Sequence, residues 1–224
     1  MIINGLRRII RFMRRIMPWI AVAITLLNAL EDPMWLAFSL WLLVYLLRAR
    51  LRRWIDHWSI PNAYIALGVT FGLLVESFAI LDNLDLPPDE RILLNPNPIA
   101  DLIMGAVYYT FVIVTWYLLL RRIAYTSRQV FLITGVFGIV VEQSGAILLG
   151  IIGSPIIGGL LALLVMCIYG MFPQMAYWLT VHQFSTERKP VTRRYMGLAL
   201  VALFVQYALY GLFIFPTLTV LFGD

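Results

Sequence analysis

The chain has 224 residues, of which 62% are hydrophobic and 13% are charged, and its formal net charge at pH 7 is +5. With a mean hydropathy of +0.87, this composition excludes an ordinary soluble domain. The basic balance does not indicate nucleic-acid binding, because the Lys and Arg residues sit where the topology of a membrane protein requires them.

Residues 1–16 combine apolar side chains at helical spacing with five arginines that fill the other positions. This pattern predicts an amphipathic interfacial helix, lying in the headgroup layer of a membrane. A membrane span needs about 20 mostly apolar residues. Seven later segments approach or exceed that length, at 17–31, 34–49, 60–81, 98–120, 129–151, 155–181 and 195–221. We therefore predict an all-α, polytopic transmembrane helix bundle with seven spans, forming one membrane domain over 17–224.

Charge divides the connections between these segments into two classes. Sixteen of the 17 Lys and Arg residues lie before the first segment or around alternate connections, near 48–53, 121–128 and 188–194. Acidic residues dominate the connections at 31–32 and 82–90. By the positive-inside rule, the N-terminus is predicted to be cytoplasmic in a multi-pass protein of the cell membrane.

Two segments share a short internal repeat. Residues 71–77 (Phe-Gly-Leu-Leu-Val-Glu-Ser) match residues 137–143 (Phe-Gly-Ile-Val-Val-Glu-Gln). A weaker match in the segments that follow aligns Tyr108 with Tyr169. The pattern predicts a duplicated helical hairpin, at about 60–120 and 129–181.

Three carboxylic acids fall inside the predicted spans: Glu76, Glu142 and, in the first turn of its segment, Asp101. A charge near the bilayer centre costs at least about 2.5 kcal/mol, so intramembrane acids indicate a functional site. The predicted topology puts all three in the outer half of the membrane. Gly72 and Gly138 precede the two glutamates by four residues, which predicts that both acids face a neighbouring helix.

We therefore predict an acidic pocket, roofed by the loop at 82–97. Its predicted catalytic residues are Glu76, Glu142 and Asp101, and its predicted substrate-binding residues are Gln143, Asn83 and Tyr108. Such a pocket suits acid–base chemistry on a lipophilic, isoprenoid-like substrate that arrives through the lipid. Two alternatives stay open: a non-catalytic subunit or assembly factor whose glutamates lock helices together, and a small transporter.

The histidines, the cysteine and the lysine are the other residues that could bind a metal or a cofactor. His57 and His182 lie at the predicted cytoplasmic surface, where they suit either haem or pigment ligation or an aromatic belt. One cysteine, Cys167, offers no thiolate metal site, so no metal is predicted and the cofactor is unknown. The single lysine, Lys189, lies outside the predicted spans, so no predicted span has an amine that could form a Schiff base with retinal. The expected partners are membrane lipids and other membrane subunits, with no nucleic acid.

The run Gly138-x-x-x-Glu142-x-x-Gly145 resembles integral membrane carotenoid-biosynthesis enzymes, the lycopene cyclases and carotenoid hydratases. These families are multi-span bundles that carry membrane-embedded acidic residues, and the resemblance extends over about the third to sixth segments. It implies that Glu142, with Glu76 as its repeat partner, protonates a polyene. The residues at 146–149 are Ala-Ile-Leu-Leu and depart from the Thr-Gly and aromatic continuation of the hydratases.

Overall fold

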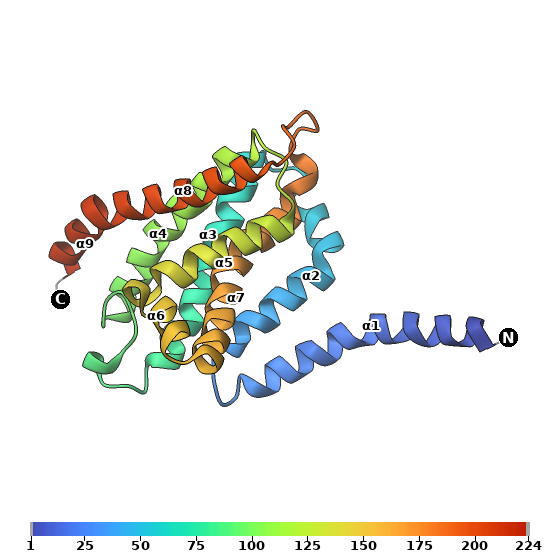
Figure 1. The fold of residues 1–224 in the computed structure, drawn as a ribbon, viewed down its shortest axis with the longest axis horizontal. Coiled ribbons are helices and arrows are strands. Elements are labelled where there is room, and N and C mark those ends of the chain that lie inside the picture. Colours follow the sequence, from blue (N-terminus) through green and yellow to red (C-terminus); the bar gives the residue numbers. More distant parts are fainter. Residues whose placement is uncertain (1, 223–224) are drawn as a thin grey trace.

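The structure, a computed structural model, describes the backbone of residues 2–222 and their side chains except those of 2–12, 14, 15 and 144. This part of the chain is helical and contains no β-strand, which confirms the predicted all-α class (Figure 1). The α-helices are α1 (Ile2–Asn28), α2 (Trp35–Ile55), α3 (Ile60–Asn83), α4 (Pro98–Leu120), α5 (Ser127–Val141), α6 (Ala146–Gly153), α7 (Pro155–Thr180), α8 (Arg193–Leu209) and α9 (Phe215–Phe222).

Four helical stretches are long and apolar enough to cross a membrane. They are α3, α4, α7 with its terminal turn (Pro155–Gln183), and the continuous run of α8 and α9 (Arg193–Phe222). The pair α5 and α6 qualifies as a fifth span if its two parts are counted together. α1 contributes a shorter apolar stretch, Ile16–Asn28. By length and composition, the described residues thus form a helical membrane protein with four or five candidate spans.

The segment predicted as a span at 129–151 is not one continuous helix. α5 ends at Val141, residues Glu142–Gly145 form a 3₁₀ turn, and α6 leaves at 85° to α5. Gln143 and Gly145 have φ angles of 46° and 90°, in the left-handed region where glycine is the favoured residue. Because the helix stops here, Gly145 does not share a helical face with Glu142.

Local sequence determines where α4 and α5 begin. Asn97 caps α4, accepting hydrogen bonds from the N–H groups of Ile99 (2.9 Å) and Ala100 (3.4 Å). Thr126 and Gln129 form a reciprocal capping box at the start of α5. These caps satisfy backbone donors that a helix start leaves free, and they set the register of the two helices.

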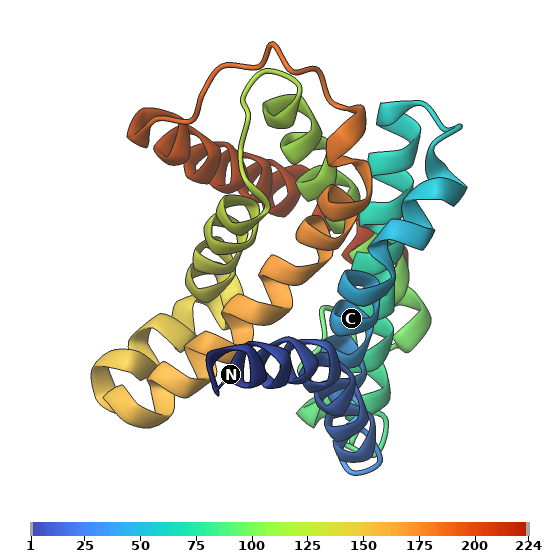
Figure 2. The ribbon, with the colours of Figure 1, turned by 90° about the vertical axis from the view of Figure 1, so that its right-hand side faces the viewer.

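α7 runs through the middle of the bundle and packs against α2, α3 and α5 (Figures 1 and 2). α4 pairs with α3, and α8 covers α4 and α5. α1 packs against α2, while its N-terminal part extends away from the other helices (Figure 1). The backbone of the predicted interfacial segment 1–16 therefore belongs to α1, and most of its side chains lie outside the described residues.

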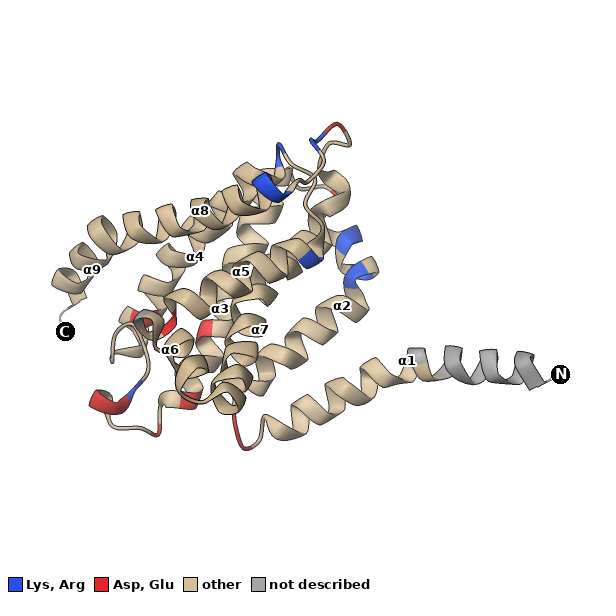
Figure 3. Ribbon diagram, viewed as in Figure 1, with Lys and Arg blue, Asp and Glu red and all other residues tan. Residues whose placement is uncertain are grey.

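Charge separates to opposite ends of the bundle (Figure 3). The connections α2–α3, α4–α5 and α7–α8 gather at one end in both Figures 1 and 2. Apart from Arg91, the Lys and Arg residues with described side chains lie in the α4–α5 and α7–α8 connections, at the starts of α5 and α8, and in the last two turns of α2. The acidic connections α1–α2 and α3–α4 lie at the other end. The exceptions in these connections are Asp56 and Glu187 at the basic end and Arg91 at the acidic end.

Arginines at the basic end hold helix termini together. Arg52 of α2 donates from Nε and Nη2 to the carbonyl oxygen of Trp178, at 2.8 and 2.5 Å. Arg188 donates from Nη1 to the carbonyl oxygen of Leu120, at 3.3 Å. Carbonyls in the last turn of a helix lack intrahelical donors, so each arginine satisfies a group that would otherwise need water.

Candidate functional site

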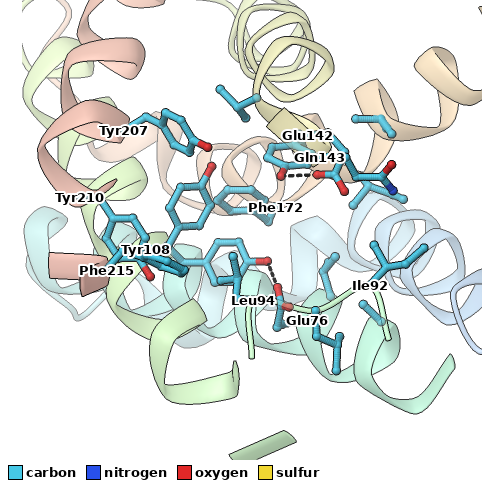
Figure 4. Close-up of a pocket in the computed structure, with 18 of the residues that line it drawn as sticks. Glu76, Ile92, Leu94, Tyr108, Glu142, Gln143, Phe172, Tyr207, Tyr210 and Phe215 are labelled. Atoms are coloured by element: carbon cyan, nitrogen blue, oxygen red, sulfur yellow. Dashed lines mark hydrogen bonds between the residues drawn. The ribbon is translucent and has the colours of Figure 1, made fainter. Parts of the chain in front are cut away.

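A cavity of about 490 Å³ lies between α3, α4, α7, α8, the 3₁₀ turn after α5 and the α3–α4 loop (Figure 4). This volume falls within the range of about 300–1,000 Å³ that is usual for small-molecule sites. Two carboxyl groups, those of Glu76 and Glu142, line it. The aromatic lining residues are Tyr108, Tyr109, Tyr169, Phe172, Tyr207, Tyr210 and Phe215. None of the described lining residues is Lys, Arg or His.

Glu76 is paired with a tyrosine of the neighbouring helix. The hydroxyl of Tyr109 on α4 donates a hydrogen bond to Oε2 of Glu76 on α3 (Figure 4). A Cβ atom on Gly72 would lie 2.5 Å from Cγ of Tyr109, and one on Gly105 would lie 3.4 Å from Cγ of Glu76. The absence of a side chain at Gly72 therefore lets the Tyr109 ring reach α3, as predicted for Gly72, whereas a Cβ atom on Gly105 would make an ordinary contact.

Glu142 is paired in the same way. The hydroxyl of Tyr169 on α7 donates a 2.6 Å hydrogen bond to Oε2 of Glu142, which directly follows α5. A Cβ atom on Gly138 would lie 2.3 Å from Cγ of Tyr169. Each glutamate thus lies four residues after a glycine. The tyrosine whose ring packs against this glycine donates a hydrogen bond from its hydroxyl to the glutamate.

Sequence reasoning missed Tyr109 and Tyr169 as partners of the two acids. The repeat alignment matched Tyr108 with Tyr169, but the structure gives the corresponding hydrogen bond to Tyr109. The available signal was the tyrosine pair at 108 and 109, together with the glycine four residues before each glutamate. In Figure 4, Glu76 and Glu142 lie on opposite walls of the cavity.

Two departures from regular α-helix form part of the cavity wall. One is the 3₁₀ turn that carries Glu142 and Gln143. The other is a π-helical turn, Tyr210–Ile214, whose residues Tyr210 and Gly211 line the cavity between α8 and α9. π-Turns within helices are frequent at functional sites, because they re-aim side chains at a local cost in regularity. Gln143, predicted to bind substrate, lies on the cavity wall opposite Tyr207 (Figure 4).

Tyr108, also predicted to bind substrate, presents an unused polar group. It is 7% exposed and lines the cavity, and its hydroxyl has no hydrogen-bond partner among the described residues. Its neighbour Tyr210 differs, because that hydroxyl donates to the carbonyl oxygen of Met104 at 3.1 Å. A buried hydroxyl without a partner is costly, and this one belongs to a residue of the cavity wall.

Asp101 and Asn83 lie beside the cavity and are not lining residues. Oδ1 of Asp101 accepts from the N–H groups of Leu94, at 2.7 Å, and Asn95, at 3.1 Å. Oδ1 of Asn83 accepts from the N–H of Ile92 at 2.9 Å. Both residues therefore hold the α3–α4 loop, which contributes Ile92 and Leu94 to the cavity. The loop was predicted to roof the site, and these two residues act on the site through it.

The histidines lie elsewhere and have other partners. Nε2 of His57 accepts a 2.9 Å hydrogen bond from Trp58, and Nε2 of His182 lies 2.6 Å from Oδ1 of Asp56. Both belong to the basic end of the bundle. Within the described residues, no group of three or more His, Cys, Asp or Glu side chains could hold a metal ion.

No protein-family model, curated protein or solved structure matches this chain. The resemblance of 138–145 to carotenoid-biosynthesis enzymes therefore rests on its sequence motif. Independently of that resemblance, the geometry brings two Glu–Tyr pairs and an aromatic wall onto one cavity.

Proposed function

We propose that the protein binds a lipophilic, isoprenoid-like molecule in the cavity and moves protons on it by acid–base chemistry. The observation that carries this proposal is that Glu76 and Glu142, each paired with a tyrosine, line the same cavity. A carboxyl group donates a proton to one carbon of a double bond, which leaves a carbocation. A carboxylate then removes a proton from a carbon next to it, so the double bond shifts and no other reactant is consumed.

The aromatic wall supports this chemistry. The faces of Tyr and Phe rings attract positive charge, by about 2 kcal/mol or more where water is excluded. Phe172 and Tyr108 belong to this wall and are almost fully buried. They would stabilise the carbocation relative to the neutral olefin, which is the difference that accelerates a reaction.

We also propose a seven-pass arrangement in the cell membrane, with the N-terminus in the cytoplasm. In it α1 and α2 join the five candidate spans, with α5 and α6 counted as one span, and the first turns of α1 lie along the membrane surface. The charge separation between the two ends of the bundle supports this orientation (Figure 3). The cavity then lies in the outer half of the membrane, near the acidic loop. We interpret the two similar Glu–Tyr pairs as remnants of a duplicated hairpin.

Two alternatives have observations of their own. Each Glu–Tyr hydrogen bond joins two helices, α3 to α4 and the end of α5 to α7, as expected for a non-catalytic subunit or assembly factor whose acids lock the bundle. The broken run of α5 and α6 lines the cavity, and broken helices at membrane depth are typical of substrate sites in transporters.

Deuterium incorporation tests the proposal. The protein is purified in mild detergent, incubated in D₂O, and its co-purifying lipids are analysed by mass spectrometry. We expect a bound isoprenoid-like lipid that gains deuterium on carbon in the wild type and in Glu187→Gln, an exposed control at the basic end. Glu76→Gln and Glu142→Gln should abolish the incorporation. Equal lipid content and no incorporation in any variant would contradict the proposal, and a stably co-purifying chain would favour the subunit.

A further inference from the structure

We propose that the cavity is a binding site for hydrophobic organic cations, such as ammonium or phosphonium centres that carry apolar groups. This goes beyond proton transfer to a neutral olefin, and it does not depend on that activity. It rests on the charge of the cavity, on the chemistry of its walls and on one buried hydroxyl.

The cavity contains acidic groups without a basic counterpart. Glu76 and Glu142 are its charged residues among the described lining, and none of the others is basic. Arg91 is the cation nearest in sequence, in the loop that supplies Ile92 and Leu94. Its guanidinium group donates hydrogen bonds to the carbonyl oxygens of Leu84, Leu86 and Pro96 in the same loop, at 2.9–3.3 Å. A carboxyl group held away from water ionises at low cost only beside a counter-charge, and here a cationic ligand would provide it.

The walls suit an organic cation better than a metal ion. Hard metal ions take six or more oxygen ligands at fixed distances. The described residues contain no group of three or more candidate metal-binding side chains, whereas the cavity has seven aromatic rings. Figure 4 shows Tyr207, Tyr210 and Phe215 on the side of the cavity opposite Glu142. A cation with apolar substituents can contact ring faces and carboxylates at once.

Tyr108 supplies an observation independent of charge. Tyr108 is only 7% exposed, and its hydroxyl has no hydrogen-bond partner among the described residues. The hydroxyl oxygen is therefore free to turn its lone pairs toward a bound cation. Because a buried hydroxyl without a partner is costly, this group favours a polar or charged ligand that would supply one.

Binding of tetraphenylphosphonium tests the inference, with triphenylphosphine oxide as a neutral counterpart of similar shape. Equilibrium dialysis of the detergent-purified protein should show saturable binding of about one cation per chain, at least about tenfold tighter than the neutral compound. Glu76→Gln and Glu142→Gln should each weaken cation binding by about tenfold or more, and Tyr108→Phe by a few-fold. The exposed control Glu187→Gln should bind like the wild type.

Equal binding of the two compounds to the wild type would overturn the inference, and so would undiminished cation binding in the double variant Glu76→Gln/Glu142→Gln. The comparison of two compounds on the wild type needs no variant, so it decides even if a variant fails to fold. Cation binding without deuterium incorporation would support this inference and refute the proposed activity. Incorporation without preferential cation binding would do the reverse.

Discussion

Gly138 and Tyr169 are in direct contact: a Cβ atom added to the glycine would lie 2.3 Å from Cγ of the tyrosine ring. The hydroxyl of the same ring binds Glu142, four residues after Gly138. The contact between α5 and α7 thus determines where the tyrosine hydroxyl lies, and through it the position of one of the two acids. Gly72 and Tyr109 stand in the same relationship to Glu76.

Gly138→Ala should therefore lower the stability of the protein by about 1–3 kcal/mol, the usual cost of forcing a methyl group into a packed interior. We expect a lower midpoint of thermal unfolding, and weaker binding of tetraphenylphosphonium because Tyr169 must move. Gly197→Ala is the matched control, because nothing lies within 4 Å of a Cβ atom there. If both variants unfolded at the same temperature, close packing at Gly138 would be refuted.

Tyr169→Phe removes the hydrogen bond to Glu142 and keeps the ring. Leaving a buried acceptor without its donor costs about 1–3 kcal/mol, so the unfolding midpoint should fall. Tyr109→Phe should behave alike, because it deprives Glu76 of its donor. Tyr45→Phe serves as a control on a ring that is 41% exposed. A midpoint for Tyr169→Phe no lower than that of Tyr45→Phe would argue against the Glu142 pair.

Arg52→Gln should loosen α2 from the end of α7. Two donors of Arg52 bind the carbonyl oxygen of Trp178, and loss of a charged donor commonly costs about 1.5–3 kcal/mol. Hydrogen–deuterium exchange should rise in the last turn of α7 and the turn after it, around 178–183. Arg53→Gln, a change to an exposed neighbour, should leave the exchange as it is. Equal exchange in the two variants would show that this contact does not hold the helices.

The orientation can be tested with single cysteines. Cys167 is the only native cysteine, so Cys167→Ser provides the background for Asp85→Cys or Glu187→Cys, both at exposed positions. A membrane-impermeant maleimide should label position 85 in intact cells and position 187 only after permeabilisation. The reverse pattern would place the N-terminus outside. Labelling of both positions from the same side would contradict the three proposed membrane crossings between them, which are the segments 98–120, 129–151 and 155–181.

Sequence could predict the boundaries of α4 and α7. The segment predicted at 98–120 is the helix Pro98–Leu120, because the start signal Asn97-Pro98 is local. The segment predicted at 155–181 is the helix Pro155–Thr180, which again begins at a proline. Hydropathy and capping depend on neighbours in sequence, so they carry this information without any tertiary contact.

The break after α5 could not be found from hydropathy, because the chain stays apolar on both sides of it. The local signal was the run Gln143-Ser144-Gly145, which contains a typical helix-ending glycine. The spacing of four between Gly138 and Glu142 favours a continuous helix instead. The π-helical turn Tyr210–Ile214 has no comparable signal, since it depends on how α8 packs over the bundle.

Sequence could predict the two glutamates of the candidate site but not the tyrosines that donate hydrogen bonds to them. Both glutamates line the cavity, and the helix-facing glycines before them could be read from a spacing of four. The choice between Tyr108 and Tyr109 could not, because consecutive residues of a helix point about 100° apart and only the packing of α3 on α4 decides which one meets Glu76. The hydrogen bonds of Asp101 to the α3–α4 loop have no sequence signature.

Dicyclohexylcarbodiimide, an apolar reagent that modifies protonated carboxyl groups in membranes, tests the central claim most directly. Peptide mass spectrometry of treated membranes should find adducts on Glu76 and Glu142, and none on the exposed Glu187. Prior addition of tetraphenylphosphonium should protect both glutamates, because they share one cavity. Adducts on neither glutamate, or on only one with the other unaffected by the cation, would contradict a common acidic site.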